Sequence, residues 1–218
     1  MTEKVKTGAS YMKICILDYG SGNVRSVFNI FSSICHEVIV SNDNEDIKSC
    51  SHIVLPGVGS FGTAMEKIKQ RIDIEKLEQE ILVNRKPFLG ICVGMQVLAD
   101  IGFEFGSYKG LGWISGTVRK ISSAGMPLPH VGWNNVLKSQ NHPVIERLPN
   151  EPDFYFVHSY CFEPENPASI VGMSQYGEEF PSIIAKENIL GVQFHPEKSQ
   201  KAGLMLIEAF LNIQKAEK

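Results

Sequence analysis

The chain has 218 residues, of which 43% are hydrophobic and 21% charged, and its formal net charge at pH 7 is −3. These values are typical of a globular protein with one sizeable α/β domain, and the lack of a basic block argues against a nucleic-acid surface. No apolar run approaches the roughly 18 residues that a membrane-spanning helix needs. We therefore expect neither a nucleic-acid partner nor a membrane partner.

The first residues, MTEKVKTGASYM, carry lysines but no apolar segment behind them, so they do not resemble a secretory signal. We expect residues 1–12 to form a disordered tail and residues 13–218 to form a single domain. The five cysteines are odd in number and none belongs to a C-x-x-C pair, which argues against a disulfide framework or a cysteine zinc site. We expect a cytoplasmic location, no metal and no cofactor.

In chain order, the first half alternates continuous apolar runs with segments of helical periodicity. The apolar runs are typical of buried strands, and they end in turns that contain glycine. The predicted strands are 13–20, 36–41, 51–59 and 87–92, and the predicted helices are 23–34, two pieces within 62–85, and one in 94–100. This alternation predicts an α/β fold with a doubly wound, mainly parallel sheet and flanking helices.

The second half contains short strand-like segments in succession, which predict an antiparallel extension and therefore a mixed sheet. They lie at 113–121, 133–138, 153–160, 169–175 and 181–187, before a buried strand at 190–197 and an amphipathic helix at 199–217. Ligands of such sheets bind beyond the carboxyl ends of the parallel strands. The loops that this rule selects are 18–23, 56–62, 90–96 and 195–199.

A candidate nucleophile stands in one of these loops. The segment from Gly90 to Gly94 reads G-I-C-V-G, the cysteine form of the nucleophile elbow, a sharp strand-to-helix turn that needs small residues on both sides. In such a turn Cys92 projects from the strand end and the Val93 N–H faces a developing oxyanion. The N-terminus of the following helix would favour a thiolate. The alternative is a buried structural cysteine in a tight turn.

A nucleophile of this kind needs a base and a group that orients the base. His195 follows an apolar strand in the segment V-Q-F-H-P-E, and Pro196 disfavours a helix at this point. Glu197 is two residues on, so both side chains can lean the same way from extended backbone. The carboxylate can then hold one imidazole nitrogen while the other faces Cys92. The alternative is a turn with a surface histidine.

Together these motifs resemble the class I, or triad, glutamine amidotransferases. The resemblance rests on LGICVGMQ (89–96) and GVQFHPEKS (191–199) and covers residues 13–215. Within that family, four further segments are similar to the glutaminase subunits of imidazole glycerol phosphate synthases: DYGSGNVRSV (18–27), LPGVGSFG (55–62), PHVGWNN (129–135) and FVHSY (156–160). The elbow departs slightly from the usual pattern, because Val93 stands where relatives usually have leucine.

The resemblance implies a fold, a substrate and roles for single residues. It implies the class I amidotransferase fold, the side-chain amide of L-glutamine as substrate, Cys92 as nucleophile, His195 as base and Glu197 as orienting acid. The implied substrate contacts are Gln96, Glu104, Gly94, His158 and Ser159. The implied oxyanion hole uses Val93 and the loop of Gly57, Val58 and Gly59, where we expect the hole to be incomplete until a partner is engaged.

The resemblance also implies a partner. Ammonia released into water at pH 7 becomes mostly ammonium, which is not nucleophilic, and the sequence has no second catalytic domain to receive it. The implied partner is a separate cyclase of (β/α)8 barrel type, which would form a heterodimer with this chain. The residues expected at the interface are Asn23, His130, Trp133, Asn134, Tyr155 and Lys198.

Other functions remain open at this point. Paralogous proteins supply ammonia to the amination of nucleotide sugars or surface polysaccharides, with the same glutaminase chemistry. A γ-glutamyl peptidase with the same triad and a catalytically inactive binding module are further alternatives, which Gln96, the P-G-V-G loop and the intact triad argue against. The segment G-S-G-N-V-R lacks the third glycine of a dinucleotide-binding loop.

Overall fold

The computed structural model describes residues 12–35 and 37–213, so the tail predicted for residues 1–12 lies outside the described residues apart from Met12. The elements of the first half are β1 (Lys13–Ile16), α1 (Val24–Ile34), β2 (Glu37–Val40), α2 (Asn44–Ser49), β3 (His52–Gly57), α3 (Phe61–Arg71), α4 (Ile74–Glu78), a π-helical segment (Gln79–Val83), β4 (Phe88–Cys92) and α5 (Val93–Gln96). They alternate strand and helix, as the sequence predicts.

The second half is mostly strands. Its elements are β5 (Ile101–Gly102), β6 (Tyr108–Lys109), β7 (Gly116–Lys120), β8 (His130–Asn135), β9 (Leu137–Lys138), α6 (Pro143–Glu146), β10 (Asp153–His158), β11 (Tyr160–Pro164), a 3-10 turn (Pro167–Ser169), β12 (Ile170–Tyr176), β13 (Glu178–Lys186), β14 (Ile189–Val192), a second 3-10 turn (Pro196–Lys198) and α7 (Gln200–Leu211).

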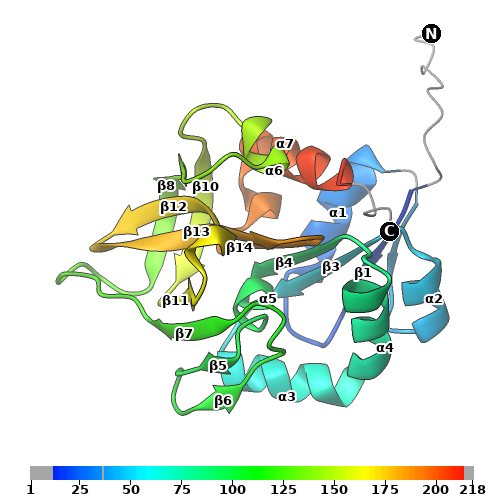
Figure 1. Cartoon of the computed structure of the whole chain (residues 1–218). Helices are drawn as coiled ribbons and strands as arrows, with labels where there is room; N and C mark the ends of the chain where they lie inside the picture. Colours follow the sequence, from blue (N-terminus) through cyan, green and yellow to red (C-terminus); the bar gives the residue numbers. More distant parts are fainter. Residues whose placement is uncertain (1–11, 36, 214–218) are drawn as a thin grey trace, which may run out of the picture.

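The central sheet has the strand order β2-β1-β3-β4-β14-β13-β12-β9. The pairs from β2 to β14 are parallel, and those from β14 to β9 are antiparallel. Helices α1 and α7 lie on one face of this sheet, and α3 and α4 lie on the other (Figure 1). The predicted doubly wound, mainly parallel mixed sheet with flanking helices is therefore confirmed.

Two small sheets share no strand pairing with the central sheet. Strands β8 and β10 form an antiparallel pair, and β11, β7, β5 and β6 form a four-stranded sheet. The sequence predicts most of these strands but places them in one mixed sheet. Periodicity reports which residues of a strand are buried and not which strand it pairs with, so the division into three sheets was not accessible from the sequence.

The core explains why the parallel strands come together. All residues of β3 and β4, and all four of β14, are buried, because helices cover both faces of this part of the sheet. The register aligns Gly57 with Cys92 and Ile91 with Val192. The carboxyl ends of three neighbouring strands therefore meet at one edge. Among the residues described, no helix is both long and apolar enough to cross a bilayer.

Candidate active site

A small cavity lies at the edge where β3, β4 and β14 end. Its volume is about 170 Å³. Cys92, the last residue of β4, and His195, three residues beyond β14, both line it. The remaining lining residues are Val58, Gly59, Val93, Gln96, Glu104, Val157, His158, Ser159, Tyr160 and Lys198. The structure thus brings together residues that the sequence places about a hundred positions apart.

The backbone at Cys92 has the geometry of a nucleophile elbow. Its φ is 55° and its ψ is −111°, a conformation that costs a non-glycine residue free energy and clusters at functional sites. A Cβ atom on Gly90 would collide with the backbone of Gly94, and one on Gly94 would collide with the carbonyl oxygen of Leu55. Both glycines are therefore needed for α5 to approach β3 and β4 closely.

This geometry shows what two of the glycines expected at the site do in the structure. Gly94 is buried against β3 and is not among the residues that line the cavity, so the role that the structure gives it is to pack the elbow. Gly57 does not line it either, and a Cβ added there would collide with the backbone of Gly94 and the hydroxyl of Tyr19. Val58, Gly59 and the elbow residue Val93 do line the cavity.

Helix α5 is shorter than the helix predicted for residues 94–100, since it has only four residues. The helix dipole expected to favour a thiolate at Cys92 is therefore much smaller than predicted.

His195 and Glu197 form a buried pair. The imidazole Nδ1 lies 2.9 Å from Glu197 Oε1, and the two side chains are 4% and 1% exposed. Asn23, the N-cap residue of α1, makes no side-chain cap bond. Its amide instead donates to the same carboxylate oxygen at 3.4 Å. Asn23, expected at a partner interface, therefore supports the acid of the triad.

The electrostatics of His195 favour its charged form. Burial alone would lower the pKa of the imidazole, but the neighbouring Cys92 sulfur and the Glu197 carboxylate together outweigh burial and raise the pKa to about 10. At neutral pH His195 therefore carries a proton that it can give to a leaving group.

Besides Cys92 and His195, the lining of the cavity includes further polar side chains. Gln96 is 3% exposed, and its Nε2 donates to the carbonyl of Tyr160 and to Gln193 Oε1, each at 3.0 Å. Glu104 Oε2 accepts a hydrogen bond of 2.7 Å from the N–H of Phe61 at the start of α3. Burial raises the pKa of Glu104, and the Phe61 N–H partly opposes that rise.

A buried pair of histidines supports these side chains. His158 Nδ1 donates to the Tyr160 carbonyl at 2.9 Å, so its Nε2 is left to accept from His130 Nδ1, also at 2.9 Å. Asn134 Nδ2 lies 3.4 Å from the remaining ring nitrogen of His130 and donates to the Gln175 carbonyl at 2.9 Å. Burial lowers the pKa of His130 to about 4 and that of His158 to about 3, so both rings are neutral.

His130, which the sequence places at a partner interface, is turned into the protein in this structure. Its side chain is buried, and the ring stacks on Tyr176 and Phe156, with centroid distances of 4.1 and 5.1 Å. Alternation along β8 explains the difference, because His130 points inward while its neighbours at odd positions point outward. Asn134 is also turned inward, toward His130.

The other expected interface residues gather at the cavity mouth. Trp133 is 49% exposed and meets the ring of Tyr155 edge-on, with a centroid distance of 6.0 Å. The Nζ of Lys198, which lines the cavity, lies 5.6 Å from the Tyr155 ring centroid. These three side chains, of which Trp133 and Lys198 are exposed and Tyr155 is half-buried, form one cluster next to the triad, the Trp133–Tyr155–Lys198 cluster.

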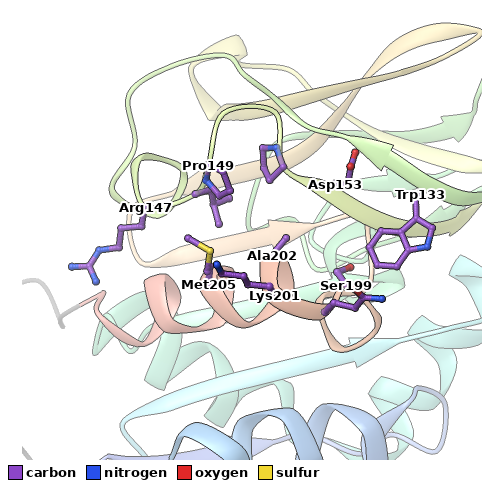
Figure 2. Close-up of a pocket in the computed structure, with 11 residues that line it drawn as sticks. Trp133, Arg147, Pro149, Asp153, Ser199, Lys201, Ala202 and Met205 are labelled. Atoms are coloured by element: carbon purple, nitrogen blue, oxygen red, sulfur yellow. The ribbon is translucent and has the colours of Figure 1, made fainter.

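A larger groove extends from this cluster. It has a volume of about 730 Å³ and runs along α7, with Trp133 and Arg147 at opposite ends and Lys201 and Met205 on the helix (Figure 2). It contains no residue of the triad. Ser199, which also lines it, accepts from the Tyr155 N–H at 3.0 Å and donates to the His195 carbonyl at 2.6 Å. The groove therefore lies behind the triad and is separate from the catalytic cavity.

Sequence reasoning missed three residues that matter at the site. Gln193 is fully buried and its Nε2 lies 3.7 Å from Cys92 Sγ. The Tyr19 hydroxyl is buried beside Gly57 without a hydrogen-bond partner among the described residues. Ser199 anchors the backbone behind His195. For Gln193 a signal existed, since it is a polar residue within the apolar strand that leads to His195.

The described part of the chain contains no group of three or more histidine, cysteine, aspartate or glutamate side chains that could hold a metal ion. The Cys92, His195 and Glu197 set is an arrangement for nucleophilic catalysis: a thiol, a base and an acid that orients the base. It can cleave an acyl or amide bond through a covalent intermediate.

Comparison with known proteins agrees with this chemistry. A family profile described as glutamine amidotransferase class-I matches residues 15–213. A protein of Rhodospirillum rubrum, named imidazole glycerol phosphate synthase subunit HisH, is 43% identical over 211 residues, which cover 92% of this chain and 98% of that protein. A protein of the same name from Methanocaldococcus jannaschii is 44% identical over 200 residues, covering 92% and 99% of the two chains.

Solved structures with low sequence identity share the fold. The structure of PurLQS from Thermotoga maritima matches with a TM-score of 0.72 at 18% identity, covering 93% of this chain and 99% of that one. A glutamine amidotransferase from the same organism matches with a TM-score of 0.62 at 19% identity, covering 94% and 84%. The profile, the relatives and the elbow with its His–Glu pair lead to one conclusion: the chain belongs to the class I glutamine amidotransferases.

Proposed function

We propose that this chain is the glutaminase subunit of an imidazole glycerol phosphate synthase. It hydrolyses L-glutamine to glutamate and ammonia and passes the ammonia to a cyclase partner in histidine biosynthesis. The observation that carries the chemistry is the approach of Cys92 to the His195–Glu197 pair in one small cavity. The pathway is supported by relatives of that name, which are 40–44% identical over nearly the whole chain.

The reaction follows from the positions of these groups. Cys92, whose thiol proton has passed to His195, attacks the side-chain amide carbon of glutamine as a thiolate, and the carbonyl oxygen takes up negative charge. His195, protonated at neutral pH, gives its proton to the departing ammonia. A water molecule, deprotonated by His195, then attacks the γ-glutamyl thioester carbon. The carbon–sulfur bond breaks, and glutamate leaves while the cysteine is restored.

The oxyanion hole in this proposal consists of the Val93 N–H and a backbone donor of the Val58–Gly59 loop. We propose that this loop is not in its productive conformation in the free chain and adopts it when the partner docks. Two features support this: the Val58 side chain is 40% exposed, and the buried Tyr19 hydroxyl beside the loop lacks a partner among the described residues. A free chain that hydrolyses glutamine as fast as the complex would contradict the proposal.

The polar side chains of the cavity are proposed to hold the substrate. Gln96, Glu104, His158 and Ser159 all line the cavity together with His195. Glu104 keeps one carboxylate oxygen free of the Phe61 N–H, and a substrate ammonium group is a suitable partner for it. Gln96 meets the substrate with its oxygen, because its nitrogen is used within the protein.

The proposed partner is a separate protein of (β/α)8 barrel type. It docks on the Trp133–Tyr155–Lys198 cluster, which borders the cavity mouth, and thereby keeps the released ammonia away from water. Aromatic side chains that bury large areas frequently carry most of the binding energy of an interface. We place the heterodimer in the cytoplasm, which agrees with five cysteines that are all free.

One variant tests the assignment of the nucleophile. In complex with the synthase partner, Cys92→Ala should lose glutamine-dependent synthesis by a factor of at least about 10³, because the covalent route is closed. The same complex should still use added ammonium salts. If both activities disappear, Cys92 is structural and the proposal is wrong.

A second experiment tests the pathway. The natural complex is purified and its second protein is identified. A sugar-modifying partner would replace histidine biosynthesis as the function.

A further inference from the structure

Gln193 is an unusual residue for its place in the fold. It follows β14, lies between two apolar residues and has no exposed surface. Its backbone N–H donates to the Ser182 carbonyl at 2.9 Å, which continues the pairing of β14 with β13. A buried amide is costly unless its donors and acceptor find partners. The partners of Gln193 are the nucleophile and the substrate-side residue Gln96.

The orientation of both amides is set by a backbone carbonyl. The oxygen of Tyr160 can only accept, so the Gln96 atom that faces it at 3.0 Å must be the nitrogen. The same nitrogen donates to Gln193 Oε1, also at 3.0 Å. The amide nitrogen of Gln193 is then turned toward Cys92 Sγ, at 3.7 Å. Reversal of either amide would set oxygen against oxygen or nitrogen against nitrogen.

This chain of bonds has a consequence for the substrate side. Both hydrogens of the Gln96 amide are used by Tyr160 and Gln193, so only its oxygen remains for a ligand in the cavity. Gln96 therefore offers an acceptor, which suits an N–H group of glutamine. If the hold of Gln193 on Gln96 were lost, the amide could rotate and present a donor instead.

The same chain has a consequence for the sulfur. Besides His195, Cys92 Sγ has two hydrogen-bonding contacts among the described residues: the carbonyl of Val157 at 3.9 Å and the Gln193 amide nitrogen at 3.7 Å. A carbonyl oxygen repels a thiolate, whereas an N–H group stabilises it, and hydrogen bonds to charged acceptors are about twice as strong as neutral ones. The Gln193 donor also limits the directions in which the sulfur can point.

We propose that Gln193 is a positioning residue of the glutaminase reaction, which holds the Cys92 sulfur through its nitrogen and fixes Gln96 as an acceptor through its oxygen. This inference rests on the proposed function. It extends the site beyond the triad, because it links the nucleophile to the substrate-binding side through one buried side chain.

Two variants separate the two roles. Gln193→Glu keeps the shape and the acceptor for Gln96 but replaces the donor near the sulfur with an oxygen. In complex with the synthase partner, its kcat for glutamine should fall about 10-fold to 100-fold with little change in KM. Gln193→Leu removes both groups, so its kcat should fall by a similar factor and its KM for glutamine should rise at least about 10-fold.

A second readout does not depend on glutamine turnover. The rate at which iodoacetamide alkylates Cys92 should be measured against pH in the whole chain. Without the Gln193 donor, the rate profile should move to higher pH in both variants. Ser182→Ala is the matched control, because its buried hydroxyl, next to Gln193 in the sheet, has no hydrogen-bond partner within residues 12–35 and 37–213 and does not line the cavity. It should leave the profile and both kinetic constants unchanged.

The outcomes distinguish this inference from the proposed function. If Gln193→Glu is folded and retains the kcat and the alkylation profile of the unaltered protein, Gln193 only fills space and the inference is wrong. If Gln193→Leu fails to fold, the Glu variant still decides. If the unaltered complex does not hydrolyse glutamine while the alkylation profile shifts in the variants, the positioning of the sulfur stands and the proposed substrate fails.

Discussion

The two walls of the catalytic cavity are built by different means. The first wall, at the ends of β3, β4 and β14, is backbone geometry: parallel register, a strained Cys92 and glycines at close approaches. The second wall, at residues 157–160, is a network of buried polar side chains that includes His130, His158 and Gln96. The first wall depends on glycines at positions where a larger side chain would collide with the backbone. The second wall depends on hydrogen bonds between segments that are distant in the sequence.

The largest effect should come from a single methyl group in the first wall. In Gly94→Ala the new Cβ collides with the carbonyl of Leu55, and a backbone atom within a buried strand cannot move aside. We expect a loss of at least about 3 kcal/mol in the free energy of unfolding, measured by urea denaturation.

Gly125→Ala is a suitable control for that change. Gly125 has a positive φ, of 87°, but nothing lies within 4 Å of its added Cβ. Its substitution should cost only about 1–2 kcal/mol, from the backbone conformation alone. Equal costs at Gly94 and Gly125 would show that close packing does not distinguish the first wall.

The next effect concerns catalysis at the same wall. Glu197→Gln keeps the shape of the acid but can offer an N–H to His195 Nδ1, and without the carboxylate the pKa of His195 should fall from its raised value. We expect kcat/KM for glutamine in the complex to fall by a factor on the order of 10⁴, as for the orienting acid of the Ser-His-Asp triad. Glu208→Gln, an exposed change on α7, should leave the value unaltered.

The residues of the first wall can be recognised in the sequence because their geometry depends on neighbours in the chain. The elbow and the H-P-E segment each need particular residues at adjacent positions, so both are visible as short motifs. The alternation of strands and helices then indicates that the loops carrying these motifs meet at one edge of the sheet. The short helix α2 was missed although it has a local signal, the Asp43 side chain that caps the N–H groups of Glu45 and Asp46. Its six residues are too few for periodicity to be visible.

The second wall could not be predicted in the same way. Gln193 meets Cys92 across 101 residues of sequence, and His130 meets His158 across 28 residues, so neither pair leaves a local pattern. The inward direction of His130 was not predicted either, because a family resemblance indicates a segment and not the direction of each side chain in it. Which face of β8 is buried became clear only from its antiparallel pairing with β10.

The second wall should be broken by unpairing its histidines. His158→Phe leaves the His130 donor buried without its partner and removes one of the bonds to the Tyr160 carbonyl. We expect a loss of about 1–3 kcal/mol in the free energy of unfolding. The double variant with His130→Phe should lose less than the sum of the single losses, since neither ring is then left unpaired. Strict additivity in urea unfolding would show that the two rings act independently.

The same pair predicts a dependence of stability on pH. Burial holds the pKa of His130 near 4 and that of His158 near 3, below the value of about 6.5 in the unfolded chain. Between about pH 3 and pH 6.5 the unfolded chain therefore binds more protons than the folded one. The contribution of the neutral histidines to the free energy of unfolding is fully present above about pH 6.5 and is lost as the pH falls toward 3. Imidazole NMR titration of the folded protein should show both rings neutral at pH 5. A ring that titrates near pH 6.5 would contradict the buried network.

The smallest effect is expected for Tyr19, whose substitution tests whether a polar side chain of the first wall contributes to activity. The Tyr19 hydroxyl is buried beside Gly57, beneath the Val58–Gly59 loop, and makes no hydrogen bond to the described residues. Burial raises the pKa of Tyr19 and the nearby Cys92 adds to that rise, while the backbone of Val58 opposes it. Because an unpaired buried hydroxyl destabilises the fold, Tyr19→Phe should raise the free energy of unfolding by about 1 kcal/mol.

If the hydroxyl pairs with the loop when the partner docks, the same variant should lower partner-stimulated glutaminase activity by about 2-fold to 10-fold, the value of one neutral hydrogen bond. Activity of the free chain should not change, because there the hydroxyl makes no hydrogen bond to the part of the chain that the structure describes. A gain in stability without a loss of stimulated activity would assign Tyr19 to packing. The first wall would then consist of backbone geometry alone, and polar side chains would serve only the second wall and the triad.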